Sequence, residues 1–318
     1  MVTWGRRALG ATWIVGLSTV LCPLHAAFAQ VEAPSGVGGV ANPSYQPPQD
    51  TLETTYGLAM GSGARAGATG TSALAYNTSN MAAVSAYHIE AFSQIAPGNK
   101  GLGGTYWTIG SSVVDSTTSK KIAMGTSFRG VFSGQDRLYS GWDWRSGIGV
   151  QAIPQLGLGI GFRWANLDAD RVDGQRVGPS FNGVTLDASA TISPIPWLRI
   201  SGLGYNLVKT HSALAPQMAG ASVSLAPVES FSVGGDILFD FTTFASTKLI
   251  AGGGVSYIAG EMIPLRLGYR RDSGRGLNQM TAGVGFTKGK VGIEAALRQD
   301  IGGLKKTDLL FMFRYAVE

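Results

Sequence analysis

The stretch Gln155–Trp164, "QLGLGIGFRW", alternates between large apolar side chains and small or charged residues. A period of two places Leu158 and Ile160 on one face of a β-strand, and Gly159 and Arg163 on the other. Soluble antiparallel sheets usually cover their outer face with polar side chains, whereas the second face of this strand is nearly bare. The pattern therefore predicts a strand whose apolar face meets something other than water.

The same alternation recurs along most of the chain. About fourteen segments carry it, near residues 86–96, 101–112, 120–133, 139–152, 155–165, 181–192, 196–208, 217–226, 229–241, 247–258, 262–272, 278–287, 289–299 and 307–317. Short connections are expected at Ile153–Pro154, Ser193–Ile195, Pro227–Val228, Ala259–Glu261 and Lys288. Mostly longer, polar connections lie between them, and this alternation is typical of outer-membrane barrels. We predict an all-β fold, a transmembrane antiparallel up-and-down β-barrel of about 14 strands.

Charge placement agrees with a barrel in lipid. Only 14% of the residues are charged, and Gly, at 46 residues, is about twice as frequent as usual. All nine lysines fall in expected turns, loops or strand ends: Lys100, Lys120, Lys121, Lys209, Lys248, Lys288, Lys290, Lys305 and Lys306. A charge costs little at the membrane rim and much at mid-membrane. Aromatic residues near strand ends suit interfacial girdles. A secreted β-sandwich or adhesin is the alternative, because it also buries its apolar face.

The N-terminus predicts export. Arg6 and Arg7 precede an apolar run, and "AAFAQ" follows with the small residues that signal peptidase requires, so residues 1–29 are expected to be a cleaved signal peptide. A membrane anchor is the alternative, although the run is short for one. The sole cysteine, Cys22, lies in this segment. Residues 30–53 are rich in Pro, Gly and polar residues and are predicted to be a flexible leader.

Residues 54–84 are dominated by small side chains and lack strand alternation. Ala59-Met60-Gly61-Ser62-Gly63, followed by Tyr76-Asn77 and Asn80-Met81-Ala82, resembles the N-terminal signature of FadL/PorV-type outer-membrane barrels. The resemblance covers some thirty residues in motif and the mature chain in architecture; Thr78 replaces the usual proline. It implies that residues 54–84 form a hatch inside a barrel spanning 85–318. The candidate hatch residues are Met60, Gly61, Gly63, Arg65, Tyr76, Asn77 and Asn80.

The resemblance also implies function. It points to passive uptake of small hydrophobic compounds, such as long-chain fatty acids, by an integral protein of the Gram-negative outer membrane. The open alternatives are a PorV-like barrel with a secretion-system protein partner, a structural barrel, and a general polar porin. Expected partners are therefore outer-membrane lipid and either a small hydrophobic ligand or a secretion protein.

Strand parity predicts which charges face the lumen. The inward positions include Glu90, Arg129, Arg145, Arg163, Asp187, Asp236, Arg266, Arg270, Glu294, Arg298 and Arg314, together with Asp143. They form either a ligand path with anion-attracting arginines or a network of salt bridges that stiffens the lumen. The balance of signs favours the network. A serine at Gly159 is expected to be tolerated there, because a hydroxyl in the lumen finds partners.

No enzyme signature emerges from the sequence. The three histidines, His25, His88 and His211, cannot form a metal cluster, and no G-x-S-x-G motif is present. The formal charge of +5 falls to +3 when Arg6 and Arg7 are removed, which is too weak to indicate nucleic acid binding. We expect no catalytic activity, no cofactor and no nucleic acid partner.

Overall fold

The computed structural model describes residues 53–97, 106–133, 140–168, 171–172, 175–176, 180–210, 212–302 and 307–317. The predicted signal peptide, and the leader up to residue 52, lie outside the described residues, as do His25 and His211. Within the described part of the chain, no helix is long and apolar enough to cross a membrane, which does not bear on crossing by strands.

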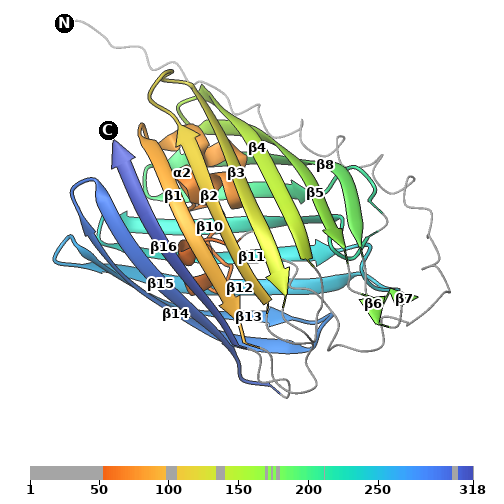
Figure 1. Ribbon diagram of the computed structural model, residues 1–318. Coiled ribbons are helices and arrows are strands. Elements are labelled where there is room, and N and C mark those ends of the chain that lie inside the picture. The colour runs from red at the N-terminus through yellow and green to blue at the C-terminus, as the bar shows by residue number, and fades with distance from the viewer. Residues whose placement is uncertain are drawn as a thin grey trace, which may run out of the picture. The chain divides into compact units, whose positions relative to one another are not determined.

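Fourteen antiparallel strands close into one barrel (Figure 1). They are β1 (Tyr87–Ala96), β2 (Tyr106–Asp115), β3 (Ile122–Ser133), β4 (Ser140–Ile153), β5 (Leu156–Asp168), β8 (Phe181–Ile195), β9 (Leu198–Tyr205), β10 (Met218–Val228), β11 (Phe231–Asp240), β12 (Lys248–Ala259), β13 (Ile263–Asp272), β14 (Leu277–Lys288), β15 (Val291–Asp300) and β16 (Thr307–Val317). The predicted fold class and strand number are confirmed. A small hairpin of β6 (Arg171–Val172) and β7 (Gln175–Arg176), which the sequence pattern did not predict, lies between β5 and β8.

The barrel closes where β1 pairs with both β2 and β16. Tyr87 is the register partner of Asp115 and of Val317, so β1 begins and β16 ends at the same rim. Five short turns lie at this rim, at residues 154–155, 196–197, 229–230, 260–262 and 289–290, together with the six-residue connection 116–121 between β2 and β3. The connections at the other rim are mostly longer. The expected turns at Ser193–Ile195 and Pro227–Val228 are wrong, because these residues extend β8 and β10.

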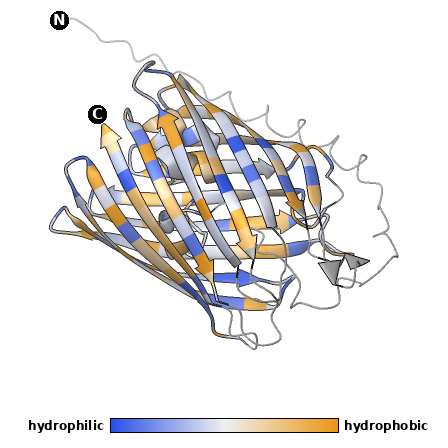
Figure 2. Cartoon of the chain, in the orientation of Figure 1, coloured by the Kyte–Doolittle hydropathy of each residue, from blue (hydrophilic) through white to orange (hydrophobic). Residues whose placement is uncertain are grey.

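Side-chain exposure alternates along the strands as the hydropathy does (Figure 2). Ile160 is 62% exposed and Leu158 45%, whereas Arg163 between Phe162 and Trp164 is only 2% exposed. The sheet has no free edge, so its backbone N–H and C=O groups are paired between strands, as lipid requires. The exposed apolar surface is therefore the lipid-facing surface, and the buried positions face the lumen.

Aromatic residues gather on the outer surface of neighbouring strands. The rings of Trp142 and Trp164 meet edge to face with centroids 5.0 Å apart, and Trp144 packs against Phe162 at 5.5 Å. Phe128 of β3 stacks near Trp142. These rings lie toward the long-loop ends of β3, β4 and β5, a placement that suits an interfacial aromatic band.

Replacing Ile160 by arginine should destabilise the barrel by about 2–4 kcal/mol, because the side chain lies at the middle of a lipid-facing strand. The measurement is reversible denaturant unfolding in lipid vesicles, with Ile160→Leu as the control. An unfolding free energy for Ile160→Arg equal to that of the control would contradict the assignment of this face to lipid.

Candidate functional site in the barrel lumen

Residues 53–84, here called the N-terminal segment, lie inside the barrel (Figure 1). The segment contains α1 (Thr55–Ala59), α2 (Gly70–Tyr76) and a 3-10 turn, η3 (Thr78–Ala83). It contacts inward-facing residues of every one of the fourteen barrel strands, from Glu90 on β1 to Met312 on β16. Only a segment that crosses the lumen can touch all of them.

A left-handed turn follows α1 and sets the path of the segment. Thr54 caps α1 by accepting a hydrogen bond from the Gly57 backbone N–H at 3.2 Å. The chain then reverses through Gly61 and Ser62, whose φ angles are +66° and +55°. Glycine adopts such a conformation without steric cost, and a side chain at Gly61 would also overlap the backbone of Tyr269. The "GSG" sequence is therefore explained by a tight turn that docks against β12 and β13.

Glycines on the inner wall of the barrel lie in close contact with the N-terminal segment. A Cβ atom added to any of several wall glycines would overlap the segment: Gly147, Gly149, Gly157, Gly159, Gly234, Gly252, Gly254, Gly268 and Gly283. Gly159, for example, faces the backbone of Thr78 and Ser79. The expectation that serine would be tolerated at Gly159 is therefore wrong, because the position is filled by main-chain atoms rather than by open lumen.

Buried ion pairs anchor the segment at its beginning and its middle. The Arg65 guanidinium lies 2.7 Å from the Asp236 carboxylate of β11, and both side chains are nearly inaccessible to solvent. Glu53 accepts a hydrogen bond from Arg298 at 2.6 Å and lies 3.5 Å from Arg270. Buried charges are strongly destabilising when unpaired, so segment and wall each neutralise the other.

A second set of wall charges surrounds the two helices. Arg266 donates to Glu294 at 2.6 Å, and Glu294 also accepts a hydrogen bond from the Thr55 hydroxyl at 2.8 Å. Glu90 accepts from Thr71 of α2 at 2.5 Å and lies 3.3 Å from Arg314. This pairing supports the interpretation of the predicted lumen charges as a structural network.

Neutral groups hold the remainder of the segment. The Asn77 amide donates to Thr191 of β8 and to Ser201 of β9, each at 3.0 Å. The Tyr76 carbonyl accepts a hydrogen bond from the Tyr205 hydroxyl, and Asn80 donates to the Ala66 carbonyl at 2.7 Å. The side against β8 and β9 is thus held by uncharged hydrogen bonds, in contrast to the ion pairs on the opposite side.

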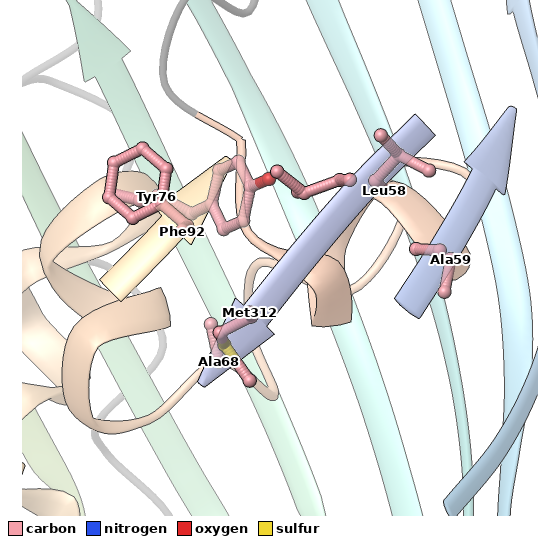
Figure 3. Close-up of a cluster of buried hydrophobic side chains, with 9 residues drawn as sticks. Leu58, Ala59, Ala68, Tyr76, Phe92 and Met312 are labelled. Atoms are coloured by element: carbon pink, nitrogen blue, oxygen red, sulfur yellow. The ribbon is translucent and has the colours of Figure 1, made fainter. Parts of the chain in front are cut away.

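Apolar packing completes the contact between segment and wall. Figure 3 shows Leu58, Ala59 and Tyr76 of the segment in one buried cluster with Phe92 of β1 and Met312 of β16. The hatch candidate Met60 is fully buried, and its backbone lies against Gly254 and Gly268. The hatch candidate Gly63 lies against the backbone of Gly252 and Gly253. All of the candidate hatch residues therefore lie in the lumen, although their role in closing it is taken up as a proposal below.

A separate charge cluster lies in the long-loop half of the barrel. Asp143 on β4 pairs with Arg129 and Arg163, each at 2.9 Å. Arg163 also donates to the carbonyl of Leu214, which holds the loop between β9 and β10 inward against Phe181. The carboxylate of Asp187 accepts a hydrogen bond from the Asn206 backbone N–H at 2.7 Å. This cluster therefore ties the wall to an inward-folded loop rather than to the N-terminal segment.

Sequence reasoning missed several lumen residues. Glu53 was assigned to the flexible leader, and Asp308, which pairs with Arg298 at 2.7 Å, was not assigned to the lumen. Arg199 was not assigned to the lumen either, although the apolar residues Leu198 and Ile200 lie on either side of it. Among the described residues, no group of three or more His, Cys, Asp or Glu side chains is arranged to hold a metal ion.

Gly159→Ser should displace η3, because the new side chain meets backbone atoms, whereas Gly161→Ser should be mild. A Cβ at Gly161 would meet only side-chain atoms, the nearest being Asp187 Cβ at 3.3 Å. Trypsin cleavage after Arg65 in the folded barrel reports displacement of the segment. Equal resistance of the two variants would contradict the close approach of η3 to Gly159.

Arg65→Met should cost about 3–5 kcal/mol of stability, because it leaves the buried Asp236 carboxylate without its cation. The double variant Arg65→Met/Asp236→Leu should recover much of that loss. Unfolding free energies of the three proteins in vesicles provide the measurement. If the single variant matches the wild type, the pair does not anchor the segment.

Comparisons with known proteins give the fold a context. No protein-family profile and no curated protein sequence matches the chain. Among solved structures, the toluene transporter TbuX of Ralstonia pickettii is similar at a TM-score of 0.61 and 13% identity, covering 83% of this chain and 97% of that one. A FadL homologue from Pseudomonas aeruginosa is similar at 0.55 and 10%, covering 83% and 97%. The monoaromatic hydrocarbon channel CymD is similar at 0.55 and 12%, covering 78% and 92%. The chain therefore has the fold of the FadL-type outer-membrane barrels.

Proposed function

We propose that the protein is an outer-membrane channel for passive uptake of small hydrophobic compounds, and that the N-terminal segment is its hatch. The observation that carries this proposal is the path of the segment, which crosses the lumen in contact with all fourteen strands. Its structural neighbours include a protein described as a toluene transporter and one described as a monoaromatic hydrocarbon channel. Long-chain fatty acids are one candidate class of ligand within the proposal.

A hatch must stay attached to the barrel wall and must also move enough to let a ligand pass. The ion pairs on the β11–β15 side, Arg65–Asp236 and Glu53–Arg298, suit a fixed anchor, because separating buried charges is costly. The contacts of Thr78 and Ser79 with β8 are hydroxyl hydrogen bonds, which contribute about 0.5–1.5 kcal/mol each. We infer that η3 moves away from β8 while the anchored side stays in place.

The alternative functions are less well supported by this geometry. A general polar porin needs a wide, water-filled lumen, and the contacts of the segment with every strand argue against one. A secretion-associated role rests on the sequence resemblance alone. A cleaved signal peptide and an outer-membrane location remain part of the proposal.

A disulfide between η3 and β8 tests the movement directly. The side-chain oxygens of Thr78 and Ser189 lie 3.1 Å apart, so Thr78→Cys/Ser189→Cys should form a bond in a mature chain that is otherwise free of cysteine. Oxidation should abolish most of the uptake of radiolabelled toluene and oleate by host cells that lack their own channel. A reductant should restore it, because the bond only locks the segment.

The two single-cysteine variants, treated with the same oxidant, control for unrelated damage. Full uptake by the oxidised double variant, with the bond verified by gel mobility, would rule out movement of η3 as the opening step.

A further inference from the structure

The first residue of the N-terminal segment is held near the opening of the lumen at the long-loop rim, here called the long-loop mouth. Glu53 accepts a hydrogen bond from Arg298 at 2.6 Å, and its carboxylate lies 3.5 Å from the Arg270 guanidinium. Arg298 is two residues from the end of β15 and Arg270 is two residues from the end of β13, and both strands end at the long-loop rim. Asp308, which pairs with Arg298, is the second residue of β16 and lies at the same rim.

After Glu53 the chain runs toward the short-turn rim. The Thr55 hydroxyl donates a hydrogen bond to Glu294 at 2.8 Å. Glu294 lies four residues before Arg298 on β15, which places it about 13 Å nearer to the short-turn rim along the strand. At its other end the segment leads directly into β1, whose first residue lies at the short-turn rim. The segment therefore crosses the lumen in one direction, from the long-loop mouth to the short-turn rim.

A chain that approached Glu53 from the short-turn rim would have to cross the same lumen a second time. The segment already contacts all fourteen strands. Its two helices pack together through Leu58 and Tyr76, and a Cβ atom on Gly57 would overlap the Tyr76 ring. On the wall side, Ala59 lies against Gly283. These contacts leave the long-loop mouth as the direct route to Glu53.

The length of the preceding chain exceeds the depth of lumen that remains beyond this anchor. Two residues of β15 separate Arg298 from the long-loop rim, a distance of about 7 Å along the strand. A flexible chain as long as residues 38–52 has an end-to-end distance of about 20 Å, which rises to about 50 Å at full extension. Their sequence, "GGVANPSYQPPQDTL", is rich in Gly, Pro and polar residues, a composition that favours solvent over a packed core.

We propose that residues 38–52 pass out of the barrel through the long-loop mouth, so that the leader lies at the cell exterior and not in the periplasm. In outer-membrane barrels the short turns face the periplasm and the longer loops face outward. The part of the leader next to Glu53 then shares the mouth with any ligand that enters from outside. The inference rests on the outer-membrane location proposed above and does not depend on uptake.

Cysteine labelling tests the position of the leader, because the mature chain expected after signal cleavage has no other cysteine. Ser44→Cys probes the leader. Ser246→Cys, in the exposed connection between β11 and β12, marks the long-loop side, and Ser230→Cys, in an exposed short turn, marks the periplasmic side. Cells that express each variant are treated with a maleimide coupled to a polymer too large to pass porins. Labelling is read as a shift in gel mobility, before and after the outer membrane is permeabilised.

Ser44→Cys should be labelled in intact cells as completely as Ser246→Cys, whereas Ser230→Cys should be labelled only after permeabilisation. Thr51→Cys, two residues from the buried Glu53, should react more slowly than Ser44→Cys, because the polymer must approach it through the mouth. Heat-modifiable migration shows that each variant is folded, and labelling in urea shows that each thiol is reactive.

Labelling of Ser44→Cys only after permeabilisation would overturn the inference, because the leader would then lie in the periplasm. Protection of Ser44→Cys under both conditions would overturn it as well, since the leader would then be enclosed in the lumen. Equal rates for Ser44→Cys and Thr51→Cys would contradict passage through the mouth. If Ser230→Cys is labelled in intact cells in place of Ser246→Cys, the proposed orientation in the outer membrane fails and the inference falls with it, whatever the uptake of ligands.

Discussion

Pairing of every backbone N–H and C=O group within lipid is the constraint on which the rest of this structure depends. A sheet meets it by closing on itself, and β1 does so by pairing with β16. Fourteen strands enclose more space than their own inward side chains fill, since about eight are enough to make a filled barrel. The chain fills part of that space with residues 53–84, whose backbone reaches the wall because the wall residues there are glycine.

Closure of the sheet also explains why the charged side chains in the lumen are paired. Carboxylates and guanidinium groups inside the barrel are shielded from bulk water. Each therefore needs a partner of opposite sign, or a hydrogen-bond donor for a carboxylate and an acceptor for a guanidinium group. The wall supplies some of these partners, as Asp143 does for Arg163, and the N-terminal segment supplies others, as Arg65 does for Asp236. Segment and wall thus depend on each other electrostatically as well as sterically.

Much of the barrel could be predicted from the sequence, because lipid on one face and lumen on the other impose a strict period of two. The period cannot show what fills the lumen, so a serine at Gly159 was predicted to be tolerated although this position faces the backbone of Ser79. Glu53 was hidden in a Pro-rich stretch, and turns were misplaced by up to three residues where Ser193–Ile195 continue β8. Tertiary contacts decide these positions, and no local pattern encodes them.

The central claim is that the lumen is occupied by the N-terminal segment and not by a water-filled pore. Single-channel recording of the purified wild-type barrel in planar lipid bilayers tests it most directly, since ion current requires a continuous aqueous path. We expect brief, small openings and no stable conductance. A large, steady, ohmic current of the kind carried by open porins would contradict this account of the lumen.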